Sequence, residues 1–162
     1  MKFTIEQLAA TLGNRLKECE FKLVTAESCT GGGLAYAITE IPGSSEWFER
    51  GLITYSNQSK IELLGIDTKI LCTNGAVSEE TARAMSEGAL TNSHANISLA
   101  ITGIAGPDGG TSDKPVGTVW FSWSCKIRGT HAIVRQFKGN RKAIREQSVL
   151  LALENLCAFV EE

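Results

Sequence analysis

Residues 21–35 have the sequence FKLVTAESCTGGGLA, and this stretch decides the fold. An apolar segment typical of a β-strand ends at Ser28, a glycine cluster follows, and a helix-forming segment comes next. This order predicts a strand, a tight turn and a helix, with a hydroxyl group beside unpaired backbone N–H groups. A turn of this kind can hold a nucleophile, an anion or both.

The whole chain has the size and composition of one globular domain. It has 162 residues, of which 43% are hydrophobic and 21% are charged, and these proportions are ordinary for a protein with its own core. The net charge is −2 without a run of Lys or Arg, which argues against long-range attraction to nucleic acid or an acidic membrane. We therefore expect one domain, residues 1–162, with no nucleic-acid or membrane partner.

The cysteines indicate a reducing compartment. There are 5 of them, an odd number, and no Cys-x-x-Cys pair occurs, so neither a disulfide framework nor a zinc site is expected. The sequence also contains no signal-peptide core and no apolar run of membrane-spanning length. These features predict a cytoplasmic protein.

Strand and helix patterns alternate along most of the chain, and two strand patterns come late. The expected elements are a helix after a capping box at Thr4, a strand at 21–26, a helix at 31–40, a strand at 50–55, helices at 57–64 and after Ser78, strands at 97–102, 119–125 and 130–137, and a helix at 141–159. This order predicts the α/β class: a single three-layer α/β/α domain with a mixed, mostly parallel sheet and a C-terminal β-hairpin followed by a helix.

Ser28 is the first candidate nucleophile. A serine hydroxyl needs a base before it can attack, and the alternative is that Ser28 and Thr30 only cap the following helix. Cys29 is a competing nucleophile, because a helix start lowers the pKa of a thiol. Adjacent residues of an extended segment point in opposite directions, so only one of the pair is expected to face a site.

Tyr55 and Lys60 are the candidates for the partners of this nucleophile. Tyr55 ends a predicted strand and Lys60 lies one turn into the next helix, so both can face the sheet edge where Ser28 lies. A lysine can act as the base for a serine if its pKa falls from about 10.4 to roughly 7–8. The alternative is a solvated lysine and a half-buried tyrosine.

Two further segments suit an anionic ligand. The glycine-rich segment 103–117 follows a predicted buried strand, and ligands of open α/β sheets bind beyond the carboxyl ends of the strands. Arg141 and Arg145 lie one helical turn apart, and two guanidinium groups there suit a phosphate or a carboxylate. The alternatives are a flexible loop and exposed surface charge. His94 and His131, the only histidines, are isolated, which argues against a Ser-His-Asp triad.

Together, these segments resemble the CinA C-terminal domain family, the nicotinamide-nucleotide amidases. The resemblance covers nearly the entire chain in order. The segments that carry it are 25–32 (TAESCTGG), 42–45 (PGSS), 55–57 (YSN) together with Lys60, 75–78 (GAVS), 102–110 (TGIAGPDGG) and 114–119 (KPVGTV).

The resemblance implies hydrolysis of the carboxamide of nicotinamide mononucleotide to nicotinate mononucleotide and ammonia, a step of pyridine nucleotide recycling. It implies Ser28 as the nucleophile, with Lys60 and Tyr55 as its partners, and it implies neither a metal nor a cofactor. Thr102 and Arg141 match family positions that are linked to the substrate site.

The remaining candidates are expected to bind the substrate. Backbone N–H groups of the Thr30–Gly33 turn are expected to stabilise an oxyanion, and the phosphate is expected near the arginines or the Gly103–Gly110 loop. Asn140 stands where relatives often carry an acidic residue, which leaves the orientation of Arg141 open. The expected substrate-binding residues are Thr30, Gly31, Gly32, Thr102, Gly103, Gly106, Arg141 and Arg145.

Two other functions stay open at this point. One is a non-catalytic nucleotide- or phosphate-binding module of the CinA type, linked to competence or the DNA-damage response. The other is a hydrolase that acts on a different amide or a phosphoester. Trp47, Phe48 and Trp120 are expected at the surface, and exposed apolar positions of this kind favour a homo-oligomer, most simply a dimer.

Overall fold

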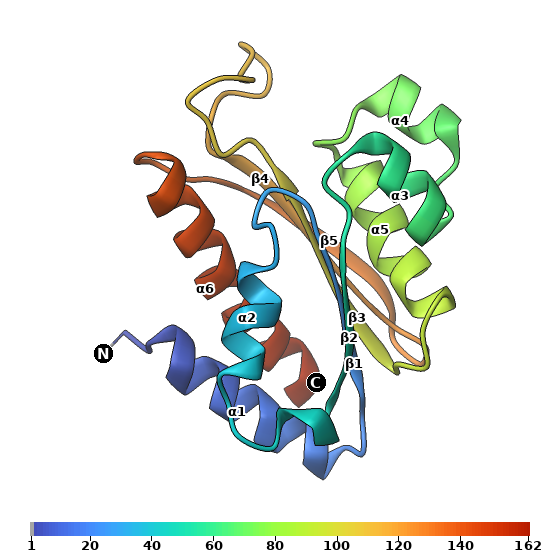
Figure 1. Cartoon of the computed structure of the whole chain (residues 1–162), viewed down its shortest axis with the longest axis vertical. Helices are drawn as coiled ribbons and strands as arrows, with labels where there is room; N and C mark the ends of the chain where they lie inside the picture. The colour runs from blue at the N-terminus through green and yellow to red at the C-terminus, as the bar shows by residue number, and fades with distance from the viewer. Residues whose placement is uncertain (1) are drawn as a thin grey trace.

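The computed structural model describes residues 2–162 and consists of a five-stranded sheet between two layers of helices (Figure 1). Met1, which begins the predicted domain, lies outside the described residues. The elements in chain order are α1 Ile5–Glu18, β1 Leu23–Glu27, α2 Gly33–Thr39, the 3-10 turn η1 Ser44–Glu46, β2 Phe48–Ile53, α3 Asn57–Leu64, α4 Thr68–Asn74, α5 Glu79–Thr91, β3 Ile97–Gly103, β4 Thr118–Cys125, β5 Gly129–Gln136 and α6 Arg141–Glu161.

The sheet is mixed, and its strand order is β2-β1-β3-β4-β5. β1 pairs in parallel with β2 and with β3, whereas β4 pairs antiparallel with both β3 and β5. β4 is therefore the one strand of this sheet that runs against the others. The predicted three-layer α/β/α domain with a late hairpin and a final helix is confirmed.

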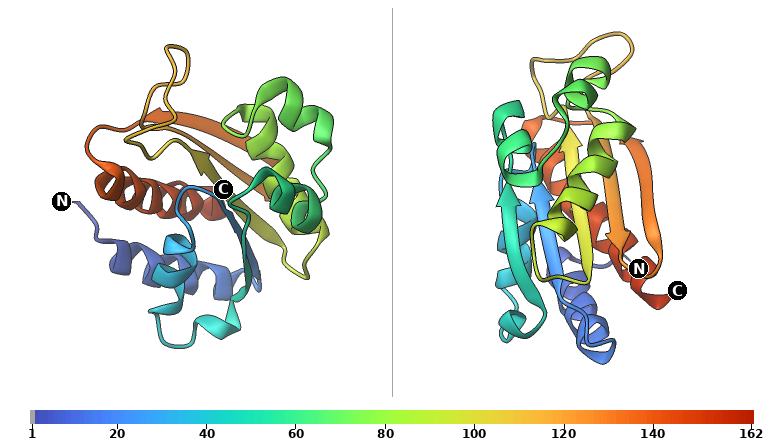
Figure 2. Two further views of the ribbon diagram at one scale, coloured as in Figure 1. Left: turned by 45° about the horizontal axis from the view of Figure 1, so that its top comes forward. Right: turned by 90° about the vertical axis from the view of Figure 1, so that its right-hand side faces the viewer.

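Each face of the sheet has its own core. Helices α1, α2 and α6 cover one face and helices α3, α4 and α5 cover the other (Figure 2). Along β3, Ile97, Leu99 and Ile101 pack into the core on the face covered by α1, α2 and α6, whereas Ala100 packs into the core on the face covered by α3, α4 and α5. Both sets are buried because the central strand has helices on both faces, and each large side chain contributes about 1.5–3 kcal/mol through burial.

Two expectations about local structure need correction. α4 was missed, although Asp67 caps it by accepting a hydrogen bond from the N–H of Lys69 at 2.9 Å. The expectation that Trp47 lies at the surface is wrong: it is 1% exposed, and its ring fills the space beside Gly13, where a Cβ atom would lie 2.6 Å from the indole. Phe48 is only partly exposed, as is Trp120, so these positions give little support to a dimer.

The topology creates a crevice at the carboxyl ends of the parallel strands. After β1 the chain crosses one face through α2 to reach β2, and after β2 it crosses the other face through α3, α4 and α5 to reach β3. The strand order thus reverses between β1 and β3, and such a reversal opens a ligand crevice at the carboxyl ends of the strands. The residues that follow Glu27, Ile53 and Gly103 lie close together at these strand ends.

The packing of α5 against the end of α3 leaves no room for a side chain at Gly88. A Cβ atom there would lie 2.1 Å from the carbonyl oxygen of Leu64. We expect overpacking in Gly88→Ala to cost about 2–3 kcal/mol, the upper part of the range for such changes, because the clash is with backbone. The gain of about 1 kcal/mol in helix propensity offsets only part of this cost, so the free energy of unfolding should fall by about 1–2 kcal/mol. Urea unfolding measures this change. Glu87→Ala, at an exposed neighbouring position, is the control, and unchanged or increased stability of Gly88→Ala would contradict the packing argument.

Candidate active site

Ser28 and Lys60 are in direct contact at this crevice. Lys60 Nζ lies 3.0 Å from Ser28 Oγ, 2.7 Å from the carbonyl oxygen of Thr54 and 3.5 Å from that of Tyr55. The contact forms because Ser28 directly follows β1, while Ser56 caps α3 by accepting a hydrogen bond from the N–H of Ser59 and so places Lys60 in the first turn of that helix.

The surroundings of Lys60 favour its neutral form. The side chain is 1% exposed, and burial lowers the pKa of Lys60 to about 8, because an ammonium loses its hydration there. A neutral amine has two N–H groups and one lone pair. When the carbonyl oxygens of Thr54 and Tyr55 accept the two N–H groups, the lone pair is left for the hydroxyl of Ser28. Lys60 is thus arranged as a proton acceptor for Ser28.

Cys29 lacks this arrangement. It is 6% exposed, and burial raises the pKa of its thiol to about 11, so the thiol stays protonated near neutral pH. Among residues 2–162, no side chain that could serve as a base is hydrogen-bonded to its sulfur. The geometry therefore favours Ser28 as the nucleophile of the pair.

A cavity of about 280 Å³ lies over the Ser28–Lys60 pair, close to the lower end of the range for small-molecule sites, roughly 300–1,000 Å³. Its walls come from five segments that are distant in the sequence. The expected site residues that line it are Ser28, Tyr55, Lys60, Thr102, Gly103, Gly106 and Arg141. The other lining residues are Cys29, which is the competing nucleophile, four members of the Gly103–Gly110 loop, Ile104, Ala105, Asp108 and Gly109, and two residues that were not expected at the site, Ala76 and Val77.

Arg141 bridges two walls of this cavity. Its Nη2 atom donates to Tyr55 Oη at 2.8 Å, and its Nη1 atom donates to the carbonyl oxygen of Gly106 at 2.8 Å. Asn140 caps α6, since its side-chain oxygen accepts a hydrogen bond from the N–H of Ala143 at 2.9 Å. Asn and Asp are about equally good helix caps. Asn140, which stands where relatives often carry an acidic residue, therefore preserves the helix start that places Arg141 at the cavity.

The hydroxyl of Tyr55 is thus bonded to Arg141, whereas its backbone carbonyl is the atom near Lys60. The side chain is 59% exposed. Tyr55 is therefore placed at the rim of the cavity, and Lys60 contacts Ser28 without an intervening phenol.

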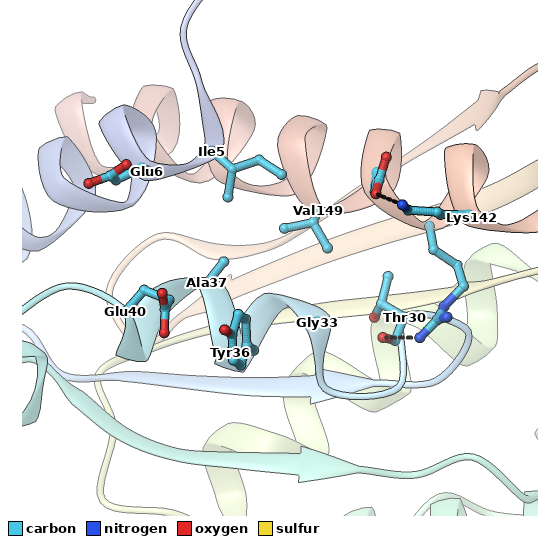
Figure 3. Close-up of a pocket in the computed structure, with 11 residues that line it drawn as sticks. Ile5, Glu6, Thr30, Gly33, Tyr36, Ala37, Glu40, Lys142 and Val149 are labelled. Carbon is cyan, nitrogen blue, oxygen red and sulfur yellow. Dashed lines mark hydrogen bonds and ion pairs between the residues drawn. The ribbon is translucent and has the colours of Figure 1, made fainter.

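Four expected substrate-binding residues lie away from this cavity. The hydroxyl of Thr30 donates to Glu27 Oε1 at 2.7 Å, and Arg145 donates to backbone carbonyl oxygens of the same turn. Thr30 and Arg145 line a second cavity, of about 720 Å³, between α1, α2 and α6 (Figure 3). Gly31 and Gly32 line neither of these two cavities. They have φ angles of 57° and 99°, in the left-handed region that glycine adopts at low cost.

Two of the four N–H groups of the Thr30–Gly33 turn are occupied. Gly31 N–H donates to the carbonyl oxygen of Ser28 at 3.0 Å, and Gly33 N–H donates to that of Thr30 at 2.9 Å. The N–H groups of Cys29 and Ala105, two residues that line the cavity of Ser28, have no acceptor on any other residue among residues 2–162. These two groups are better candidates for oxyanion donors than the N–H groups of Gly31 and Gly33.

The larger cavity contains neither Ser28 nor Lys60, so the smaller one is the candidate active site. The part of the chain that the structure describes contains no group of three or more His, Cys, Asp or Glu residues suited to a metal ion. None of the helices in residues 2–162 is both long and apolar enough to cross a membrane.

Comparisons with known proteins agree on one family. The family model of the CinA C-terminal domain matches residues 5–160. The nicotinamide-nucleotide amidohydrolase PncC of Pseudomonas putida is 49% identical over 152 residues, which cover 94% of each chain. The protein of the same name from Escherichia coli K12 is 47% identical over 151 residues, which cover 93% of this chain and 91% of that one. The crystal structure of the competence/damage inducible protein CihA from Agrobacterium tumefaciens superposes with a TM-score of 0.94 at 42% identity and covers 100% of both chains.

The environment of Cys29 predicts its reactivity. With native protein at pH 8, we expect iodoacetamide to modify the exposed Cys19 and Cys72 and to leave Cys29 unmodified, because only about 0.1% of a thiol with a pKa of about 11 is ionised at that pH. Peptide mass spectrometry measures the modification, and denatured protein, in which all cysteines react, is the control. Modification of Cys29 as fast as that of Cys72 would contradict the buried, protonated thiol.

Proposed function

Because the chain belongs to the CinA C-terminal domain family, we propose that it hydrolyses the carboxamide of nicotinamide mononucleotide to nicotinate mononucleotide and ammonia. The observation that carries the proposal is the distance of 3.0 Å between the buried amine of Lys60 and Ser28 Oγ. The name of the Pseudomonas putida and Escherichia coli relatives, nicotinamide-nucleotide amidohydrolase, supports the choice of substrate. In the cytoplasm, this reaction would serve pyridine nucleotide recycling.

In the first half of the proposed reaction, Ser28 Oγ attacks the carboxamide carbon while Lys60 takes the hydroxyl proton. The oxyanion that forms is stabilised by the N–H groups of Cys29 and Ala105, each worth about 3–4 kcal/mol in a site of this type. Lys60 then returns the proton to the departing nitrogen, the C–N bond breaks, and ammonia leaves. The product of this half is an ester between the nicotinoyl group and Ser28.

Water hydrolyses the ester in the second half of the reaction. Lys60 takes a proton from the water molecule, whose oxygen attacks the ester carbon, and the C–O bond to Ser28 breaks as Lys60 returns the proton to the serine oxygen. The pyridinium ring withdraws electrons from the reacting carbon in both halves. A neutral amine with a pKa of about 8 is therefore a sufficient base.

The rim of the cavity is suited to the ribose phosphate. Arg141 uses two of its five N–H donors on Tyr55 and Gly106, so donors remain for a phosphate oxygen. Thr102 Oγ1 donates to the carbonyl oxygen of Ala76 at 2.8 Å and thereby joins the end of β3 to the opposite wall. We assign Tyr55 to the rim, where it orients Arg141, while its carbonyl group helps to hold Lys60.

Removal of the nucleophile tests the proposal. We expect Ser28→Ala and Lys60→Met to lower ammonia release from nicotinamide mononucleotide by at least about 1,000-fold, because each variant removes one half of the nucleophile–base pair. Cys29→Ala is the matched control and should keep most of the activity; circular dichroism and thermal unfolding verify the fold of each variant. Near-normal turnover by Ser28→Ala would eliminate the serine mechanism. Binding of the nucleotide by the wild type without ammonia release would indicate a binding module instead.

The pKa of Lys60 predicts the pH dependence of the reaction. A base must lose its proton before it can act, so kcat/KM should rise about tenfold per pH unit below about 8 and level off above it. Initial rates of ammonia release between pH 6 and pH 9.5 give this profile. A profile that is flat, or that falls as the pH rises over this range, would rule out neutral Lys60 as the base.

A further inference from the structure

The turn that carries Ser28 is bonded to a buried carboxylate that the mechanism above does not use. Glu27, the residue before Ser28, is 0% exposed. Its Oε1 atom accepts hydrogen bonds from Thr30 Oγ1 at 2.7 Å and from the N–H of Leu34 at 2.9 Å, and its Oε2 atom accepts one from the N–H of Ala35 at 3.0 Å. The carboxylate therefore joins the turn to the first residues of α2.

A guanidinium group bonds to the same turn. Arg145, on α6, donates through Nε to the carbonyl oxygen of Cys29 at 3.1 Å and through Nη2 to that of Thr30 at 3.2 Å. In Figure 3, Thr30 lies on the wall of the second cavity that faces α6, where Lys142 is labelled. Arg145 thus fixes Cys29 and Thr30, the two residues after Ser28, through their carbonyl groups.

Glu27 and Arg145 act on the turn and not on each other. Among residues 2–162, neither takes part in an ion pair within 4.0 Å. A buried carboxylate without a counter-ion is costly, and here three donors, two of them N–H groups at a helix start, offset that cost. An apolar side chain could fill the position of Glu27 without this cost but could not bond the turn to α2.

The position of Ser28 needs such support because glycines follow it closely. On the upstream side, the N–H of Ser28 donates to the carbonyl oxygen of Ile101 at 2.9 Å, which fixes it to β3. On the downstream side, residues 31–33 are all glycine, and a glycine segment left to itself samples many backbone conformations. A displacement of about 1 Å of a reacting group can cost about 100-fold in rate.

We propose that Glu27 and Arg145 form a turn clamp, a pair of positioning residues that keeps Ser28 Oγ within hydrogen-bonding distance of Lys60 Nζ. The inference deepens the proposed function and rests on it. Neither residue lines the cavity over Ser28, so both act through the turn and not on the substrate. The clamp should therefore affect kcat and leave KM nearly unchanged.

Two isosteric or charge-preserving variants test the clamp. Glu27→Gln replaces one acceptor oxygen by a donor that faces the N–H of Ala35, and Arg145→Lys keeps the charge but loses the two-point contact. We expect each to lower kcat for nicotinamide mononucleotide by about 10- to 100-fold with KM within about twofold. The midpoint of the pH profile should not move, because the base is untouched. Crystal structures of the variants should show Ser28 Oγ beyond hydrogen-bonding distance of Lys60 Nζ.

Lys142→Ala is the matched control. Lys142 lies on the same helix and lines the same second cavity, but its side chain is 83% exposed and its ion pair, at 3.8 Å, is with Glu146. The kcat of the Lys142→Ala variant should equal that of the wild type. If Glu27→Gln fails to fold, Thr30→Val removes one hydrogen bond to Glu27 and should lower kcat, whereas Thr30→Ser, which keeps the hydroxyl, should restore it.

The outcomes separate the clamp from a merely structural role and from the proposed function. A fall in kcat together with a displaced Ser28, at temperatures well below the unfolding transition, supports the clamp. An unchanged kcat, or a lower kcat with Ser28 in place, overturns it. If the wild type releases no ammonia from nicotinamide mononucleotide, the proposed function fails, but the position of Ser28 in the variant crystals still decides whether the clamp exists.

Discussion

The chemistry of this protein depends on one buried amine. The pKa of Lys60 falls from 10.5 to about 8, which corresponds to about 3 kcal/mol of lost hydration for the charged form. The fold sustains this loss because the amine is not left without partners: the carbonyl oxygens of Thr54 and Tyr55 accept its N–H groups. Those same contacts leave Ser28 as the remaining partner of the nitrogen. Burial therefore sets the protonation state of Lys60, while the two carbonyl groups set its direction.

The sheet topology brings the two reacting groups together. Ser28 follows β1, Lys60 lies in the helix after β2, and Thr102 lies near the end of β3. These three strands are parallel and adjacent, so their carboxyl ends meet at one edge. The crossing of α2 over one face and of α3 to α5 over the other leaves this edge uncovered between β1 and β3. The cavity follows from the order of the strands, and the side chains at the strand ends determine what it can do.

The sequence predicted most of this arrangement and failed where a local pattern has two physical outcomes. The alternation of strand and helix patterns was enough to predict the three layers. The strand, serine and glycine pattern around Ser28 was enough to select the candidate nucleophile. Trp47 was misplaced because its partner, Gly13, is distant in the sequence. The helix after Asp67 was missed, although Asp67 and Gly75 carry the cap and stop signals that could have revealed it.

The case of Arg145 shows why a site of this kind cannot be completed from sequence. Arg141 and Arg145 share one face of α6, and a guanidinium group bonds a phosphate and a carbonyl oxygen with the same N–H groups. Only the tertiary structure separates them: Arg141 reaches the rim of the cavity, and Arg145 reaches the opposite side of the turn. One side of the turn presents a hydroxyl to a base, and the other is bonded by two buried or half-buried charged side chains. A segment rich in glycine can approach both sides closely, but it gains a defined position only from the groups that bond to it.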